Sequence, residues 1–299
     1  MSIGSFSYRV VRNLESRLQG TAAGKLGVAG YRVIRNLRVR SRRRRLTREY
    51  GRSALPLIRF GALFGSEPFR LSHYTFAPWS TSPIEHALIQ GLARRLKPCH
   101  FLEIGSLRGE LLANLNGLVE SSISLSLAKE DMVKRGYPKA VVDTNLLYEN
   151  EVKNLSVIYA DSREYDFSKL PPPPRNLVFI DGDHAYEIVR HDTRNVLNFC
   201  ARESVIVWHD YSLGDHMTVN WPVFAGILDG LPSTAWNRLY HVNNTACAVL
   251  LPESWSVRVH EDPFRPETTF SISISENPKG SCETSTVPSG AGGSESVVF

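Results

Sequence analysis

Cysteine is scarce in this chain, and no apolar run is long. The four cysteines among 299 residues have no paired spacing that would indicate a zinc site or a redox dithiol, so we expect reduced thiols in a cytoplasmic compartment. No apolar stretch approaches the roughly 20 residues that a membrane-spanning helix needs, and the N-terminus lacks the apolar core of a secretory signal. We therefore expect a protein that is not exported.

Acidic residues are nearly absent from the first 52 positions. Residues 1–52 hold 14 lysines and arginines against only Glu15 and Glu49, a net charge of +12. The other residues hold 21 basic and 28 acidic side chains, a net charge of −7. A nucleic-acid-binding face should itself be basic, so this asymmetry argues against a nucleic-acid partner for the body of the protein.

The basic arm, residues 1–52, contains a short repeat. The sequence YRVVRNL at residues 8–14 returns as YRVIRNL at residues 31–37, and its apolar residues, spaced three or four apart among arginines, predict basic amphipathic helices. Three interpretations remain open: contact with an anionic membrane surface, contact with nucleic acid or a protein partner, or a cleaved organelle transit peptide. The interleaved apolar residues favour the membrane surface, because an arm that only binds phosphates needs no apolar stripe.

Composition divides the rest of the chain. Residues 53–81, rich in aromatics and turn formers, predict a cap or linker. Ser82-Pro83-Ile84-Glu85 matches a capping box with proline at the first helical position, so a helix should run from there to about Leu96. We expect the main domain over residues 82–252, an extension over 253–275, and a disordered tail rich in Ser, Gly, Pro, Thr and Glu over 276–299.

Strand-like runs alternate with helical stretches through the main domain. They lie at residues 100–104, 122–127, 156–160, 177–180 and 204–208. Two further runs, 238–242 and 245–251, have no helix between them and predict an antiparallel closing hairpin. The pattern predicts an α/β fold with a doubly wound Rossmann-like sheet of about seven strands, whose ligand site should lie at the carboxyl ends of the parallel strands.

The first strand-to-helix turn carries an acid and two glycines, in the sequence EIGSLRG at residues 103–109. This spacing differs from the G-x-G-x-x-G dinucleotide fingerprint. It resembles the first motif of class I S-adenosylmethionine-dependent methyltransferases. The resemblance implies that this turn holds the methionine part of the cofactor through Glu103, Gly105, Ser106 and Gly109.

The next two strand ends complete the cofactor prediction less well. Asp161 and Ser162 follow the third strand, where this fold commonly contacts the adenine, although Asp-Ser is also a routine helix N-cap. In most of these enzymes the second strand ends in an acid that takes the ribose hydroxyls, but Ser126 or Leu127 stands at that place here. Glu130, slightly further on, is the expected substitute.

The fourth and fifth strands are followed by the sequences DGDHAYEIVRHD at residues 181–192 and HDY at residues 209–211. Their order is similar to that of the methyltransferase branch that includes cephalosporin-hydroxylase-like and sugar O-methyltransferases, over roughly residues 82–251. The resemblance implies an O-methyltransferase that acts on a hydroxyl of a sugar or another small molecule.

Neighbouring strands should place Asp181 and Asp210 side by side, close enough to share a divalent cation to which His209 adds a nitrogen. Such a cation removes the repulsion between the carboxylates and lowers the pKa of a bound hydroxyl. The resemblance implies Mg²⁺ at this site, with Asp181 shared between metal and cofactor and with His184 as the base. Three alternatives remain: Asp183 as a helix cap, Asp192 as a structural acid paired with an arginine, and His209 as a residue that only orients Asp210.

Two other functions remain open at this point. A methyltransferase-like binding module without catalysis, tethered to a membrane surface, would explain the missing acid of the second strand. An RNA methyltransferase could use the basic arm for phosphate contacts, although the acidic body argues against it.

Overall fold

The computed structural model describes residues 37–65, 67–214, 217–260 and 269–275. The chain divides into two compact units, Met1–Pro263 and Phe264–Phe299. In the second unit the described residues, 269–275, form no helix or strand. Both copies of the arm repeat, apart from Leu37, and the tail predicted to be disordered lie outside the described residues. Residues 37–50 are helical, and none of the described helices is long and apolar enough to cross a membrane.

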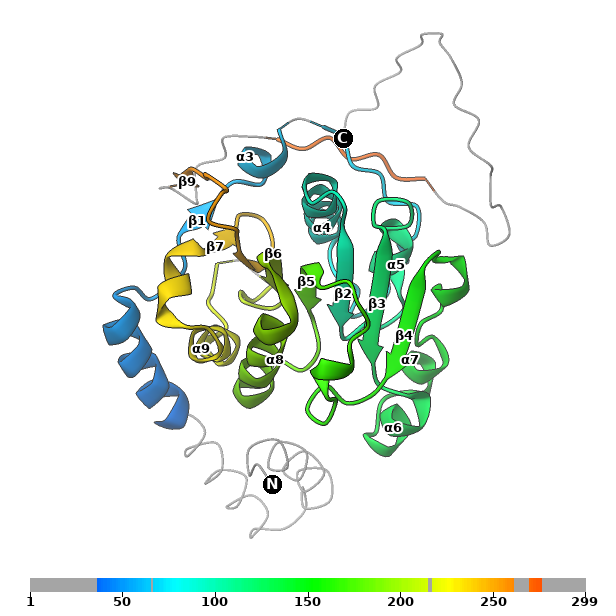
Figure 1. Ribbon diagram of the computed structural model, residues 1–299, viewed down its shortest axis with the longest axis horizontal. Coiled ribbons are helices and arrows are strands. Elements are labelled where there is room, and N and C mark those ends of the chain that lie inside the picture. The colour runs from blue at the N-terminus through cyan, green and yellow to red at the C-terminus, as the bar shows by residue number, and fades with distance from the viewer. Residues whose placement is uncertain (1–36, 66, 215–216, 261–268, 276–299) are drawn as a thin grey trace, which may run out of the picture. The chain divides into compact units, whose positions relative to one another are not determined.

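One mixed sheet organises the first unit, with the strand order β4-β3-β2-β5-β6-β8-β7-β1-β9 (Figure 1). Strands β2 to β6 run parallel, and β8 is antiparallel to both β6 and β7. The predicted α/β sheet with an antiparallel closing hairpin is thus confirmed. The strands are β1 (Leu57–Ile58), β2 (His100–Ile104), β3 (Ser121–Ser126), β4 (Leu155–Tyr159), β5 (Arg175–Ile180), β6 (Cys200–Trp208), β7 (Leu239–Val242), β8 (Ala248–Leu250) and β9 (Val259–His260).

The expectation of about seven strands is wrong, because the described sheet has nine. The two additional strands, β1 and β9, come from the segments 53–81 and 253–275 and extend the sheet beyond the hairpin. Each is only two residues long, too short to show an alternating pattern. Their pairing depends on backbone bonds to distant residues, such as the one from the amide of His241 to the carbonyl of Pro56 at 2.9 Å.

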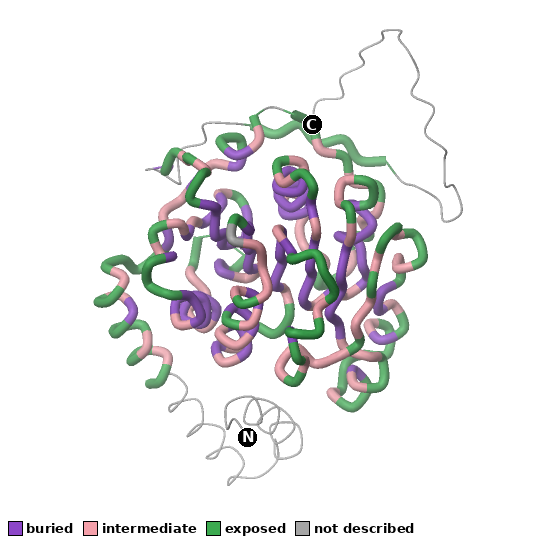
Figure 2. Tube along the Cα trace, in the orientation of Figure 1, coloured by how far each residue is buried: buried purple, intermediate pink, exposed green. Residues whose placement is uncertain are grey.

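Alternate residues of the central strands enter two separate cores. In β5, Leu177 and Phe179 pack with α4 and α5, whereas Val178 and Ile180 pack with α8 and α9. Burial on both faces explains the continuous apolar runs of these strands, which are buried in Figure 2. The helices are α3 (Phe60–Phe64), α4 (Pro83–Arg95), α5 (Glu110–Asn114), α6 (Lys129–Lys134), α7 (Lys139–Asp143), α8 (Tyr186–Phe199) and α9 (Trp221–Gly230), with the 3₁₀ turns η1 (Glu149–Glu151), η2 (Phe167–Lys169) and η3 (Ser233–Arg238).

Candidate functional site

The carboxyl ends of β2, β5 and β6 meet at one edge of the sheet. The amide of Asp181 donates to the carbonyl of Ile104 at 2.8 Å, and the amide of His209 donates to the carbonyl of Ile180 at 3.0 Å. The loops that follow these strands line a cavity of about 400 Å³. That volume lies in the range of small-molecule sites, roughly 300 to 1,000 Å³.

Most of the predicted site residues line this cavity. Three of them do not: Glu103, Gly109 and Glu130 are absent from the lining. Glu130 is exposed on α6 instead. The predicted residues that do line the cavity are Gly105, Ser106, Asp161, Ser162, Asp181, His184, His209 and Asp210.

Gly105 brings the first turn against the loop after β5. Its φ is +98°, and a Cβ at this position would lie 2.4 Å from the carbonyl oxygen of Asp181 and 2.7 Å from the Cα of Gly182. No side chain fits between these two backbones. The first glycine of the motif therefore permits the contact between the two loops that form the centre of the cavity.

Glu103 supports the same turn from inside the fold. Its buried carboxylate accepts a hydrogen bond from the hydroxyl of Ser106, which in turn accepts one from the hydroxyl of Ser124 at 2.8 Å. Burial raises the pKa of Glu103 to about 8. Glu103 thus orients Ser106. Ser106 lines the cavity, whereas Glu103 does not.

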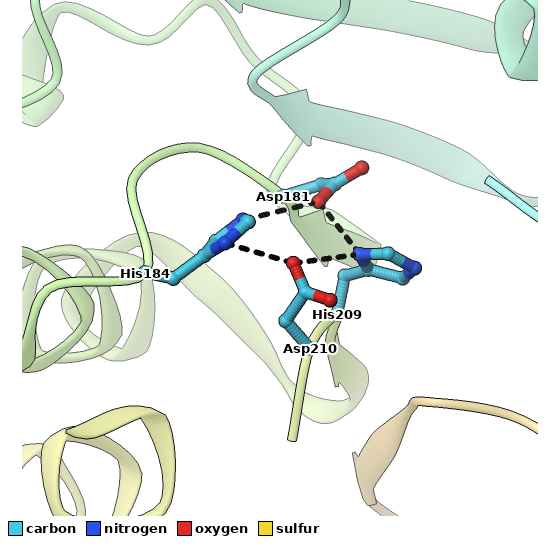
Figure 3. A group of neighbouring side chains, drawn as sticks. All are labelled: Asp181, His184, His209 and Asp210. Carbon is cyan, nitrogen blue, oxygen red and sulfur yellow. Dashed lines mark ion pairs between the residues drawn. The ribbon is translucent and has the colours of Figure 1, made fainter. Parts of the chain in front are cut away.

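Two acids and two histidines form a cluster after β5 and β6 (Figure 3). One donor atom from each of Asp181, His184, His209 and Asp210 lies within 4.8 Å of the other three. Nδ1 of His184 lies 2.8 Å from Oδ2 of Asp210, and its Nε2 lies 3.7 Å from Oδ1 of Asp181. Nδ1 of His209 lies 2.9 Å from Oδ1 of Asp181 and 3.3 Å from Oδ2 of Asp210.

The charges in the cluster shift one another's pKa values. Burial alone would raise the pKa of Asp181 and of Asp210, but the neighbouring imidazoles hold both below their ordinary value. Burial alone would lower the pKa of His184, but the contacts with Asp181 and Asp210 raise it to about 10. The same two acids also raise the pKa of His209. Protons and a cation would compete for these four donors, because a metal binds carboxylates and neutral imidazoles.

Glu85 holds the far side of the His209 ring. Its Oε2 lies 3.2 Å from Nε2 of His209 and accepts from the amide of Ser82 at 2.7 Å, while its Oε1 accepts from the amide of Ala246 at 2.6 Å. Burial opposes its charge, yet these contacts lower the pKa of Glu85 to about 2. A carboxylate behind an imidazole fixes the ring and directs its other nitrogen, as in metal sites where the ligand histidine has an acidic partner. Sequence reasoning assigned Glu85 only the cap of α4, since nothing in the spacing joins it to His209.

Comparison with known proteins finds one family whose model matches part of the chain. Residues 102–211, from β2 to just after β6, match a family described as a methyltransferase domain. The chain carries a methyltransferase domain. A comparison with curated proteins finds no match.

Solved methyltransferase structures are similar over about half of the chain. An O-methyltransferase from Bacillus cereus in complex with SAH is 18% identical over 52% of this chain and 70% of that chain, with a TM-score of 0.39. A putative O-methyltransferase from Klebsiella pneumoniae is 16% identical over 55% of this chain and 73% of that chain, with a TM-score of 0.40. SAM-bound CalS10, an amino pentose methyltransferase from Micromonospora echinaspora, is 14% identical over 44% of this chain and 52% of that chain, with a TM-score of 0.33.

At the end of β4, arginines surround the acid of the methyltransferase domain that was predicted to contact adenine. Asp161 forms ion pairs with Arg135 and with Arg163, and all three side chains line the cavity. Burial would raise the pKa of Asp161, but the two guanidinium groups hold it well below its usual range. The carboxylate is therefore already engaged. Sequence reasoning singled out neither arginine.

The cap segment adds an aromatic side chain to the rim of the methyltransferase cavity. Glu110 of α5 holds this segment, accepting from the amide of Thr75 at 2.9 Å and from the hydroxyl of Ser80 at 2.8 Å. Between these two anchors, Trp79 lines the cavity while 62% of its surface remains exposed. The abundance of aromatics in residues 53–81 was the only sequence signal for this role.

Asp192 is buried inside the methyltransferase domain without the arginine partner expected from the sequence. It is 0% exposed in α8, and within the described part of the chain no ion pair joins it to an arginine. Burial raises the pKa of Asp192 to about 7. Between about pH 4 and pH 7, Asp192 of the folded protein therefore keeps a proton that the same residue releases in the unfolded chain.

We expect Asp192→Asn to change how stability depends on pH. The unfolded carboxyl loses its proton near pH 4, so the parent's free energy of unfolding falls from there to about pH 7, by about 1.4 kcal/mol per pH unit. The variant lacks this fall. Denaturant unfolding should thus show that the variant's free energy of unfolding, relative to that of the parent, rises by on the order of 3 kcal/mol between pH 4 and pH 8. The exposed Asp143→Asn is the control, and an Asp192→Asn difference that is equal at both pH values would contradict the prediction.

Proposed function

We propose that the protein is an S-adenosylmethionine-dependent O-methyltransferase that methylates a hydroxyl of a sugar or another small molecule with the help of a metal ion. One observation carries the proposal: a single cavity is lined both by the Gly105-Ser106 turn and by the cluster of Asp181, His184, His209 and Asp210. A donor bound at the turn and a hydroxyl bound at the cluster would therefore meet in one cavity.

The chain's own residues would bind and orient the methyl donor. S-adenosylmethionine supplies a methyl group already activated on a sulfonium. The turn at Gly105 lets the backbone approach the ligand closely, and Ser106, fixed from below by Glu103, presents a polar group at the same point. Orientation of donor and acceptor accounts for much of the rate in such a transfer, because the two groups then react as if in one molecule.

The donor set fits a divalent cation. Nδ1 of His209 is buried, and no hydrogen bond of adequate alignment satisfies it. Asp181, His209 and Asp210 would hold the ion, with Glu85 orienting the imidazole. A bound ion would act as a Lewis acid that lowers the pKa of the acceptor hydroxyl. The two carboxylates suit Mg²⁺ or Mn²⁺, and the imidazole suits Zn²⁺. His184 lies on the loop between Asp181 and α8. With a cation on the two acids that raise its pKa, its imidazole would be neutral and could take the proton.

Calorimetric titration of the full chain tests the proposal. S-adenosylmethionine should bind, and Mg²⁺ or Mn²⁺ titrated alone should bind the parent but not Asp210→Asn. Absence of cofactor binding with and without metal would refute the enzyme proposal and favour a binding module. Equal metal binding by parent and variant would remove the cation from the mechanism.

We also propose that the basic arm contacts an anionic lipid surface. The helix of residues 37–50 docks on the domain beside α9 (Figure 1), through the buried Leu46, an edge-to-face contact of Tyr50 with Phe224, and an ion pair between Arg45 and Asp229. Further contacts join Arg42 to Tyr186 and Arg43 to Trp221. Those aromatic residues are the first residues of α8 and α9.

The opposite side of this helix faces solvent. Arg40, Arg44 and Arg48 follow one another at intervals of four residues, all are exposed, and none makes an ion pair within the described part of the chain. Leu37, on the same side, is 57% exposed. Charge and an apolar side chain together suit a bilayer interface, whereas the acidic body does not suit nucleic acid.

The triple variant R40Q/R44Q/R48Q should bind vesicles of phosphatidylcholine with phosphatidylglycerol on the order of a hundredfold more weakly than the parent, because each basic residue contributes about fivefold. Co-sedimentation measures this, and pure phosphatidylcholine should bind neither protein. The control R70Q/K153Q/K169Q removes the same charge from other exposed positions and should bind like the parent. Equal binding by both triple variants, or a shift of RNA in a gel without vesicle binding, would contradict the proposal.

A further inference from the structure

The end of the cavity beside β3 has no free carboxylate. Ser126, the last residue of β3, donates its hydroxyl hydrogen to the carbonyl of Ser106 at 2.8 Å. Leu127 is apolar, and Glu130 lies exposed on α6 outside the lining. Asp161, the lining acid that follows the neighbouring strand β4, is held by two arginines. A ribose at this place needs a different hydrogen-bond acceptor.

Asn145 offers that acceptor. It lies between α7 and η1, lines the cavity, and is only 5% exposed. Its Nδ2 donates to the carbonyl of Leu127 at 3.2 Å, which anchors the amide beside the residue that follows β3. This bond also identifies the other amide atom as the oxygen. Oδ1 of Asn145 is buried and has no hydrogen-bond partner.

An unpaired buried amide oxygen is uncommon, because native structures pair almost all such groups. In a cavity wall, an oxygen of this kind matches a ligand that brings a hydroxyl donor. The amide lies where the methyltransferase fold commonly presents an acid, since its anchor is the backbone of Leu127. We infer that Oδ1 of Asn145 accepts a hydrogen bond from a ribose hydroxyl of the nucleoside cofactor, in place of the missing carboxylate.

This inference rests on the proposed function and makes it more specific. A carboxylate has two oxygens and a charge, whereas the anchored amide presents one neutral oxygen. Recognition should therefore depend on one ribose hydroxyl more than on the other. Binding should also be insensitive to pH in the range in which a carboxylate would titrate.

The test uses S-adenosylhomocysteine and its 2′-deoxy and 3′-deoxy analogues as calorimetric probes of the full chain. The parent should bind S-adenosylhomocysteine about tenfold more tightly than the analogue that lacks the recognised hydroxyl. Asn145→Ala should bind S-adenosylhomocysteine more weakly than the parent does by about the same factor, and its affinity for that analogue should change little. Asn176→Ala is the matched control, because it removes amide hydrogen bonds at the opposite end of the sheet and should leave all affinities unchanged.

The outcomes separate a binding role from a structural one. A loss in Asn145→Ala that is equal for all three ligands would overturn the inference, since damage to the cavity does not distinguish a hydroxyl. Equal binding of all three ligands by the parent would overturn it as well. Both results leave the proposed function intact. Failure of the parent to bind any of them would overturn the proposed function and this inference together.

Discussion

His184→Gln should transfer methyl groups between 10² and 10⁴ times more slowly than the parent, the usual contribution of a positioned general base. The imidazole lies on the cavity wall within 2.8 Å of Asp210. Gln is similar in length and keeps polar atoms there, but it cannot accept a proton at neutral pH. Cofactor affinity should remain unchanged, because His184 belongs to the acceptor side of the proposed site.

Single-turnover transfer to a hydroxyl acceptor, selected on the parent from a panel of sugars, measures this loss. Metal affinity, determined by calorimetry on the same variant, separates two roles for His184. Unchanged affinity with slow transfer identifies a base, and affinity that falls in parallel identifies a fourth metal ligand instead. His100→Gln, at the opposite end of β2, should leave transfer unaffected.

Gly105→Ala should abolish cofactor binding and lower the free energy of unfolding by at least about 3 kcal/mol. The added methyl would lie 2.4 Å from the carbonyl oxygen of Asp181, so the turn and the loop after β5 must separate. The same loop carries Asp181, one of the two acids of the cluster, and its displacement would distort the proposed metal site as well. The backbone at φ +98° adds strain of its own for a residue with a side chain.

Gly117→Ala separates the clash from the strain. This glycine also has a positive φ, +79°, but a Cβ there would have no atom within 4 Å. It should lose only about 1 to 2 kcal/mol and bind the cofactor as the parent does. Denaturant unfolding and calorimetric titration measure both variants. Equal losses of stability in the two would show that contact with the loop of Asp181 does not matter.

The parallel strands could be predicted because their signal is local. A strand buried on both faces is a continuous apolar run, and the polar sequence that follows it marks the edge at which ligands bind. For this reason Asp181, His209 and Asp210 were predicted to lie together, and they do. His184, which the resemblance implied, lies with them. The two-residue strands β1 and β9 carry no such pattern and appear only when distant backbone groups pair.

The sequence by itself thus determined the alternation of strands and helices, the closing hairpin and the acid–histidine cluster, because each depends on neighbouring residues or on the order of strand ends. Tertiary structure alone decided which side chains stand behind and beside that cluster. Glu85 reaches His209 across 124 positions, and Asn145 reaches the backbone of Leu127 from beyond α7. Such contacts depend on how buried polar groups find partners after the chain has folded, and no spacing along the sequence encodes them.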